Sequence, residues 1–290
     1  MECVLPAAGR RDPIADVPSI EAEAARRSLH EFVRQAWSVL EPGVDFVDGW
    51  HLDAICLHLQ AVSGYDCKGN ALPLGKRIRK LIINVPFRSS KSVLTSVCWC
   101  PWEWITAPWT QWLFLSHSEE LVLKHAADRR RLIESDWYQS NWGPKSPWGR
   151  LHPDKTFTFR KEETALGRYS NSRNGYCISR PMTGVTGFGA NRCVIDDGND
   201  AQRAESDAMR NQVNSTFDNS IISRQNNFNT DAFVCIQQRT HEDDLSGHLL
   251  AKGGWEHLCI PEEYDGRDLI DLDAYKVQHA TSTRQIEHRA

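Results

Sequence analysis

The sequence predicts an α/β fold in which helices flank a mostly parallel central sheet. Short apolar stretches indicate buried strands at residues 81–85, 111–116, 192–196 and 232–236. The first stretch runs into a loop of small residues that ends in Lys91, and the third runs into two adjacent carboxylates. Because α/β sheets bind ligands at the carboxyl ends of their strands, both features lie where we expect a site.

The composition is that of an ordinary globular protein. The 290 residues are 40% hydrophobic and 25% charged, and a chain of this length can bury about 70–75% of its unfolded surface in one large domain or two small ones. No apolar run approaches the roughly 20 residues of a membrane span, so we expect no membrane association. The formal net charge of −4 disfavours a surface that binds polyanions everywhere but leaves a local basic track open.

The cysteines and the N-terminus indicate a cytoplasmic protein. Nine cysteines are scattered along the chain, and Cys98 and Cys100 lie in an apolar, tryptophan-rich stretch rather than in a zinc motif, so we expect buried thiols in a reducing compartment. Residues 1–18 are rich in Pro and Ala and lack the apolar core of a secretory signal. We expect them to form a flexible tail.

Residues 86–92 have the composition of a phosphate-binding loop. Small side chains at Ser89 and Ser90 leave backbone N–H groups able to point inward, Lys91 can reach the β- and γ-phosphates, and the Ser92 hydroxyl can ligate Mg²⁺. Ser90 stands where the usual pattern has glycine. The structural alternative is that Lys91 and Ser92 only begin a surface helix.

Asp196 and Asp197 supply a second signal for nucleotide chemistry. At the carboxyl end of a strand, the first acid can hold Mg²⁺ through water and the second can polarise an attacking water. Two acids after a strand are a weak signal alone. Combined with Lys91 and Ser92, they predict a site for a nucleotide and Mg²⁺.

Capping residues and glycines set the expected helix boundaries. Ser19 can cap a helix that runs to about residue 39, and a second helix follows His51 and stops at Gly64. Further helices are expected at residues 118–135 and 206–222. The remaining segments are a loop at residues 139–155 and strands at residues 156–159 and 176–179, which pair as a hairpin or flank the sheet.

Three segments allow both a structural and a functional interpretation. Arg129-Arg130-Arg131 form either a solvated helix end or a contact to phosphate or to a neighbouring subunit's site. Trp50 and His51 either bind adenine or anchor the core. The acids that follow His241 suggest a metal hydrolase, but consecutive side chains point in different directions and cannot all reach one ion. The simpler interpretation is that Thr240 or Asp243 caps a helix that runs through Leu250.

These motifs resemble the N-terminal ATPase domain of tailed-bacteriophage terminase large subunits, the motors that package DNA. The resemblance runs from about residue 26 to residue 261. It is carried by Trp50-His51, residues 85–92, residues 132–138 with Trp142-Gly143, residues 183–189, residues 194–197 and residues 238–248. It implies a P-loop NTPase of the additional-strand, catalytic-glutamate type over residues 19–262, which hydrolyses ATP with Mg²⁺ to drive double-stranded DNA into a procapsid.

The resemblance also implies a role for each matching residue. Asp197 takes the place of the catalytic acid, and Arg88 acts beside it. Ser92 and Asp196 bind the metal, and Gln237 and Gln238 couple hydrolysis to movement. The nucleotide is bound by Trp50, His51, Arg88, Ser89, Ser90, Lys91 and Ser92.

The sequence departs from the family pattern in three places. Ser90 replaces a glycine, and Asp197 is one methylene shorter than the usual glutamate, so its water must sit closer. Phe188 stands where an arginine is expected, which leaves the arginine that acts on a neighbouring subunit unassigned. The candidates for that arginine are Arg129, Arg180 and Arg192.

The family implies partners that the residues alone do not. We expect a monomer in isolation that assembles as a ring on the portal protein, works with the small terminase subunit and resides in the host cytoplasm. Residues 263–290 are expected to be a linker, with the nuclease domain outside this chain. The alternatives are a helicase-like, DNA-dependent ATPase and a non-catalytic packaging-assembly module whose nucleotide loop is degraded.

Overall fold

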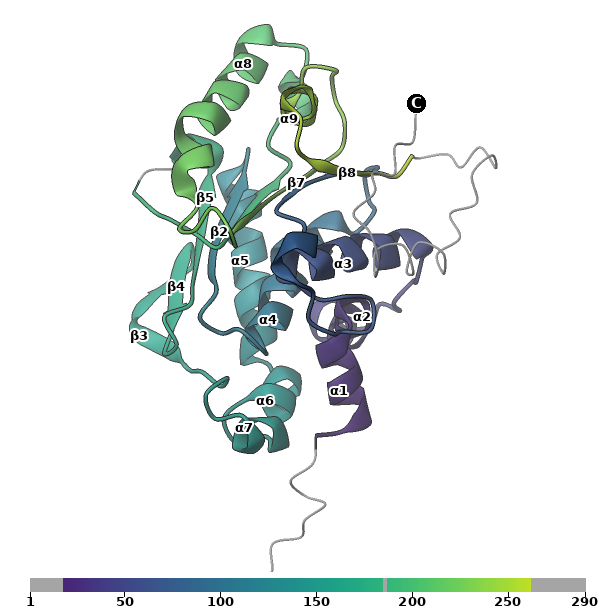
Figure 1. The fold of residues 1–290 in the computed structure, drawn as a ribbon, viewed down its shortest axis with the longest axis vertical. Helices are drawn as coiled ribbons and strands as arrows, with labels where there is room; N and C mark the ends of the chain where they lie inside the picture. Colours follow the sequence, from purple (N-terminus) through teal and green to yellow (C-terminus); the bar gives the residue numbers. More distant parts are fainter. Residues whose placement is uncertain (1–17, 185–186, 262–290) are drawn as a thin grey trace, which may run out of the picture.

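A computed structural model describes residues 18–184 and 187–261. Its centre is an eight-stranded sheet in the order β3-β4-β5-β2-β6-β7-β1-β8 (Figure 1). Neighbouring strands run parallel from β5 to β8, whereas β4 and β3 are antiparallel additions at one edge. The strands are β1 (Lys80–Asn84), β2 (Gln111–Ser116), β3 (Phe159–Ala165), β4 (Arg168–Asn171), β5 (Tyr176–Pro181), β6 (Arg192–Asp196), β7 (Ala232–Gln237) and β8 (Glu256–Cys259). The predicted mostly parallel α/β fold is confirmed.

Strand β7 lies between the strand that leads to Lys91 and the strand that ends at Asp196. In the register of the sheet, Asn84 of β1 faces Gln237 of β7, and Ile236 of β7 faces Asp196 of β6. This inserted strand is the additional strand that the resemblance implied. It brings the carboxyl ends of β1, β7 and β6 to one edge of the sheet.

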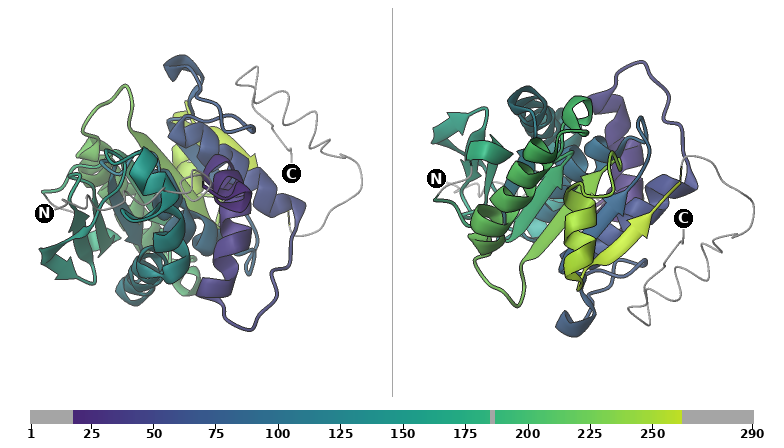
Figure 2. Two further views of the ribbon diagram at one scale, coloured as in Figure 1. Left: turned by 90° about the horizontal axis from the view of Figure 1, so that it is seen from below. Right: turned by 90° about the horizontal axis from the view of Figure 1, so that it is seen from above.

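Helices cover both faces of the sheet (Figure 2). One hydrophobic core joins α1 to α6 to one face, and a smaller core joins α8 and α9 to the other. Strand β1 is buried on both faces because Leu81 and Ile83 enter the larger core, while Ile82 enters the smaller one. The helices are α1 (Ile20–Arg27), α2 (Leu29–Leu40), α3 (Trp50–Ser63), α4 (Trp99–Trp104), α5 (Glu119–Glu134), α6 (Asp136–Trp142), α7 (Pro147–Leu151), α8 (Asp207–Thr216) and α9 (Leu245–Lys252).

Several predicted boundaries hold because their caps form. Ser19 and Ser118 accept hydrogen bonds from backbone N–H groups at the starts of α1 and α5. Gly64 ends α3 with a left-handed backbone at φ 92°.

The prediction of a single helix from Ser19 to about residue 39 is wrong, because the helix is interrupted at Ser28. Ser28 is extended, and its side chain accepts a hydrogen bond from the backbone N–H of Glu31, so it caps a second helix, α2. The Ser-x-x-Glu spacing is that of a capping box.

The loop predicted at residues 139–155 contains helical turns. Helix α6 ends at Trp142, and α7 starts with Pro147 at its first turn after a cap by Ser146. Strands β4 and β8 were not predicted, since both are short and carry polar residues. Of the two strands predicted at 156–159 and 176–179, the first begins only at Phe159. Both belong to the sheet, where β4 lies between them, so they do not pair with each other as a hairpin.

Other sequence expectations meet the structure only in part. None of the cysteines among the described residues forms a disulfide, and Cys98 and Cys100 are buried as predicted. None of the helices in residues 18–184 and 187–261 has the length and apolar character of a membrane span. Residues 1–17, 185–186 and 262–290 lie outside the described residues, and with them most of the predicted tail and the predicted linker.

Candidate nucleotide-binding site

The loop that follows β1 adopts a backbone that L-residues rarely take. Arg88 and Ser90 have φ values of 62° and 57°, in the left-handed region. This conformation costs a non-glycine residue about 1–2 kcal/mol, and such residues gather at ligand sites. Ser90, which stands where the usual pattern has glycine, therefore adopts a backbone that favours glycine. A helical segment begins directly afterwards at Lys91.

Lys91 points into the site. Its side chain is 8% exposed, and its Nζ lies 3.1 Å from Oδ2 of Asp197. The loop residue Ser89 is also buried, and its Oγ donates to the carbonyl oxygen of Pro86 at 2.9 Å. Because Lys91 is buried, it does not begin a helix on the surface, and its nucleotide-binding role stays a prediction.

Asp196 packs against the first turns of the helical segment that begins at Lys91. Its Oδ1 accepts a hydrogen bond from Ser92 Oγ at 3.0 Å, and its Oδ2 accepts one from Ser96 Oγ at 2.7 Å. Burial raises the pKa of Asp196 to about 6, and the neighbouring charge of Asp197 adds to the rise. Both hydroxyl donors oppose this shift by stabilising the carboxylate.

His125 of α5 completes this wall of the site. Its Nδ1 lies 3.7 Å from Oδ2 of Asp196. Burial, with help from the charges of Arg129 and Lys124, lowers the pKa of His125 to about 4. The imidazole is therefore neutral at physiological pH and leaves Asp196 available for a cation.

These side chains surround a cavity of about 270 Å³ at the carboxyl edge of the sheet. The strained loop, Lys91 and both carboxylates come together there, so the structure brings together the sequence-predicted residues Arg88, Ser89, Ser90, Lys91, Ser92, Asp196 and Asp197. The cavity is also lined by Phe87, Val93, Ser116, Leu121 and His125.

The donor set fits Mg²⁺. Ser92 and Asp196 present a hydroxyl and a carboxylate oxygen side by side, and Mg²⁺ prefers hard oxygen ligands. An ion that arrives with a nucleotide is typically held by one or two protein oxygens together with phosphate and water oxygens. Residues Ser92 and Asp196 would hold it.

Trp50 and His51 lie outside this cavity. Trp50 begins α3 and is 40% exposed, so it is not the core anchor that the structural alternative assumed. The two rings lie edge to face, with their centroids 6.3 Å apart. Their adenine-binding role stays a prediction.

Gln237 and Gln238 follow the inserted strand to the edge of the site. The carbonyl oxygen of Gln237 accepts hydrogen bonds from Asn84 Nδ2 at 3.1 Å and from the N–H of Val85 at 3.4 Å, at the base of the phosphate loop. The Gln237 side chain is buried, and its Nε2 has no hydrogen-bond partner among the described residues. Gln238 is exposed. Gln237 thus links β7 to the loop, and its coupling role stays a prediction.

Burial excludes two of the three candidates for the arginine that acts on a neighbouring subunit's site. Arg129 is 0% exposed: its Nε donates to Tyr169 Oη at 2.7 Å, its Nη2 donates to Ser179 Oγ at 3.0 Å, and its guanidinium lies 3.6 Å from the ring centroid of Phe114. The prediction of a solvated helix end is therefore also wrong for Arg129.

Arg192 is equally inaccessible. It lies at the amino end of β6, whereas the site lies at the carboxyl end of that strand. Its guanidinium donates two hydrogen bonds to the buried carboxylate of Glu103 at 2.7 and 3.2 Å. Arg180 remains the candidate, because it lies half-buried near the carboxyl end of β5.

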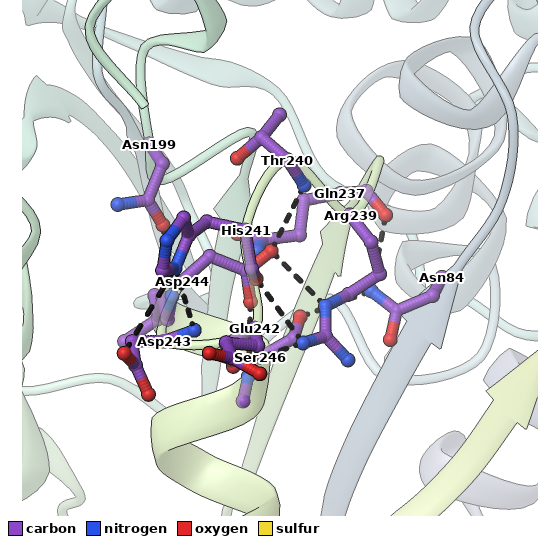
Figure 3. Close-up of polar contacts among 12 residues, drawn as sticks. Asn84, Asn199, Gln237, Arg239, Thr240, His241, Glu242, Asp243, Asp244 and Ser246 are labelled. Carbon is purple, nitrogen blue, oxygen red and sulfur yellow. Dashed lines mark hydrogen bonds and ion pairs between the residues drawn. The ribbon is translucent and has the colours of Figure 1, made fainter. Parts of the chain in front are cut away.

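The acids after His241 do not form a metal site. Asp244 caps α9, instead of the predicted Thr240 or Asp243, and its side chain is 0% exposed. Its Oδ1 accepts a hydrogen bond from the N–H of Gly247. Its Oδ2 accepts from Arg239 Nε and from the N–H of Thr240, as Figure 3 shows. Across residues 18–184 and 187–261, no group of three or more His, Cys, Asp or Glu side chains could hold a metal ion.

Sequence reasoning missed Ser96 and His125. Ser96 lies four residues after Ser92, so helical periodicity could have placed both hydroxyls on one face. No such signal points to His125, because its position depends on how α5 packs against the segment after the phosphate loop.

The chain is similar to several solved structures of phage proteins. The chain is similar to the HK97 bacteriophage large terminase, with a TM-score of 0.45 and 12% identity over 83% of this chain and 45% of that chain. It is similar to the large terminase from a thermophilic bacteriophage, with a TM-score of 0.39 and 11% identity over 76% of this chain and 48% of that chain. A structure of the same thermophilic-phage terminase in complex with ATP-gamma-S matches with a TM-score of 0.39 and 13% identity over the same shares.

The chain therefore spans about half the length of these large terminases. They are proteins of the family that the sequence motifs resemble. No family model matches the sequence, and no curated protein matches it either.

Proposed function

We propose that this chain binds ATP with Mg²⁺ and hydrolyses it. The observation that carries the proposal is the buried Lys91, whose Nζ lies 3.1 Å from the Asp197 carboxylate in the cavity that also holds the Ser92–Asp196 pair. This site combines a buried lysine, a strained loop and two carboxylates at the end of β6, an arrangement that is suited to phosphoryl transfer to water.

Each residue has a distinct task in this reaction. Backbone N–H groups of the loop cradle the phosphates, and Lys91 leaves Asp197 to neutralise the charge of the β- and γ-phosphates. Ser92 and Asp196 would hold the metal ion, which would supply positive charge to stabilise the phosphate oxygens. Asp197, once released from Lys91, orients and polarises the attacking water.

The hydrolysis serves, in our proposal, to move double-stranded DNA into a procapsid. This part rests on the motifs that resemble the terminase motor domain, over residues 19–262. It carries the expected partners with it, namely the portal protein, the small terminase subunit and further copies of the chain in a ring in the host cytoplasm. We do not expect a nuclease activity from this chain.

The direct test is to replace Lys91. We expect Lys91→Ala to abolish measurable ATP binding, because it removes the cation placed to neutralise the phosphates. Isothermal titration calorimetry with ATP and Mg²⁺ measures the affinity, and phosphate release measures turnover. The matched control is Lys145→Ala, an exposed lysine outside the cavity. Unchanged ATP affinity in a folded Lys91→Ala variant would remove Lys91 from the site.

We also expect the isolated chain to be a monomer that hydrolyses ATP slowly. Arg129 and Arg192 are committed to buried contacts, and the absence of an arginine supplied by a neighbour can cost about 10³–10⁵ in rate. Light scattering gives the oligomeric state, and the turnover per chain should rise when chains are brought together. Fast turnover that does not depend on chain concentration would show that the site is complete within one chain.

A further inference from the structure

Backbone strain is concentrated at the candidate site. Within the part of the chain that the structure describes, the non-glycine residues with positive φ are Arg88, Ser90, Asn174 and Asp197. All except Asn174 line the cavity of about 270 Å³ that contains Lys91, Asp196 and Asp197, which we call the phosphate-side cavity. Asp197, with φ at 49°, is the residue assigned above to the attacking water, so the contacts that keep its backbone in this conformation also set the direction of its carboxylate.

Three hydrogen bonds hold the main chain of Asp197. Its N–H donates to the carbonyl oxygen of Ile236 in β7 at 2.9 Å. Its carbonyl oxygen accepts two bonds from one residue, His117: the backbone N–H at 3.1 Å and the imidazole Nδ1 at 2.8 Å. The backbone bond lies beyond the β2–β6 pairing, whose register ends at Leu115 and Ile195, and the imidazole bond is a second contact from the same residue to the same oxygen.

We propose that His117 is a positioning residue for Asp197. Its imidazole fixes the carbonyl oxygen of Asp197, and thereby the strained backbone that aims the carboxylate at Lys91 and the cavity. This inference rests on the proposed hydrolysis for its catalytic consequence, although the clamp itself is a property of the fold.

The chemistry of the contact defines how His117 acts. A carbonyl oxygen can only accept, so Nδ1 carries the hydrogen, and it does so in both the neutral and the protonated ring. His117 lines a second, smaller cavity of about 130 Å³ and is not among the residues that line the phosphate-side cavity. It therefore acts through Asp197 and takes no proton from the reacting water.

Substitution of His117 separates a clamp from a proton carrier. In His117→Ala, we expect kcat for ATP hydrolysis to fall about 10- to 100-fold, because a small displacement of a catalytic group has this effect. ATP affinity should stay within about twofold. His117→Asn should recover most of the rate, because its amide N–H can reach the same carbonyl oxygen, and the shape of the pH–rate profile should not change. His152→Ala, at the end of α7, is the matched control.

Two further measurements keep the test decisive. In the Asp197→Asn background, His117→Ala should cause no further loss of rate, since a residue that acts only through Asp197 is fully coupled to it. Hydrogen exchange at the amide of Asp197 should be faster in His117→Ala than in the parent and should be restored in His117→Asn. This second readout does not depend on enzymatic activity or on the proposed function.

The outcomes distinguish the two proposals. Full kcat in His117→Ala with unchanged exchange would overturn the positioning role. So would a loss of rate that Asn does not restore and that removes one limb of the pH profile, since this indicates proton transfer by His117. A parent protein that neither binds nor hydrolyses ATP would contradict the proposed function, and hydrogen exchange would still decide whether His117 holds Asp197.

Discussion

Two neighbouring strands of the sheet, β6 and β7, each lead to a pair of adjacent aspartates, and the two pairs have opposite environments. Asp196 and Asp197 line the phosphate-side cavity, whereas Asp244 is wholly buried among its donors and Asp243 is largely exposed. In both places an acid pair follows a buried strand, although it comes directly at the end of β6 and only at Asp243 after β7 has ended at Gln237. The difference is in what donates to the carboxylates.

Asp196 receives its hydrogen bonds from two serine hydroxyls, and Asp197 pairs with the flexible side chain of Lys91. Hydroxyls can rotate and a lysine can swing away, so these carboxylates can exchange their partners for a metal ion or a water. Asp244 instead accepts from two backbone N–H groups and from Arg239 Nε. These donors are fixed by the turn that they build. An acid pair thus becomes a candidate site when its donors can be replaced.

The largest effect that sharpens this contrast is expected at Asp197. In Asp197→Asn, ATP hydrolysis should fall by about 10²–10⁴, because an amide cannot act as the base or polarise water as a carboxylate does. ATP binding should persist, since the amide keeps the size of the side chain. Phosphate release and calorimetric titration on the same preparation measure the two quantities. A variant that hydrolyses ATP at the parent rate would assign the role to another acid.

The next effect is on stability and belongs to Asp244. Asp244→Ala removes the helix cap of α9 and leaves the N–H groups of Thr240 and Gly247 without an acceptor, so the free energy of unfolding should fall by about 2–4 kcal/mol. Urea denaturation followed by circular dichroism measures the change. Asp243→Ala is the matched control, because its side chain is 75% exposed, and it should change stability by less than about 0.5 kcal/mol.

The contrast between the two aspartate pairs would be contradicted if Asp244→Ala had the stability of the parent but lost ATP hydrolysis. That result would place Asp244 in the site and show that saturated donors do not mark a structural acid.

The last prediction is the absence of an activity, namely nuclease cleavage of DNA. Two-metal endonucleases need several carboxylates around a pair of ions about 4 Å apart, and among the described residues the acids after β7 do not form such a group. We therefore expect no cleavage of plasmid DNA with Mg²⁺ or Mn²⁺, in the parent or in Asp243→Ala. Nicking that co-purifies with the protein and disappears in the Asp243 or Asp244 variants would contradict the contrast between the two pairs.

The sequence alone determined the features that depend on near neighbours in the chain. The apolar run of β1, the small-residue loop and Lys91 follow one another directly, so strand, turn and helix could be predicted from local composition. The same holds for the serine that caps α5 and for the glycine that ends α3, since a cap satisfies backbone groups within one turn of itself. The acids at the end of β6 were likewise visible, because parallel strands place their carboxyl ends at one edge.

Only the tertiary structure decided which charged residues the site can use. Arg129 looked like the end of a solvated helix, but α5 packs against the sheet and turns it into the core, where Tyr169, Ser179 and the Phe114 ring surround it. His117 contacts Asp197 because β2 and β6 are neighbours in the sheet, although the two residues are 80 positions apart in the chain. The direction in which a side chain points across such a distance is set by packing between elements, and local sequence carries no record of it.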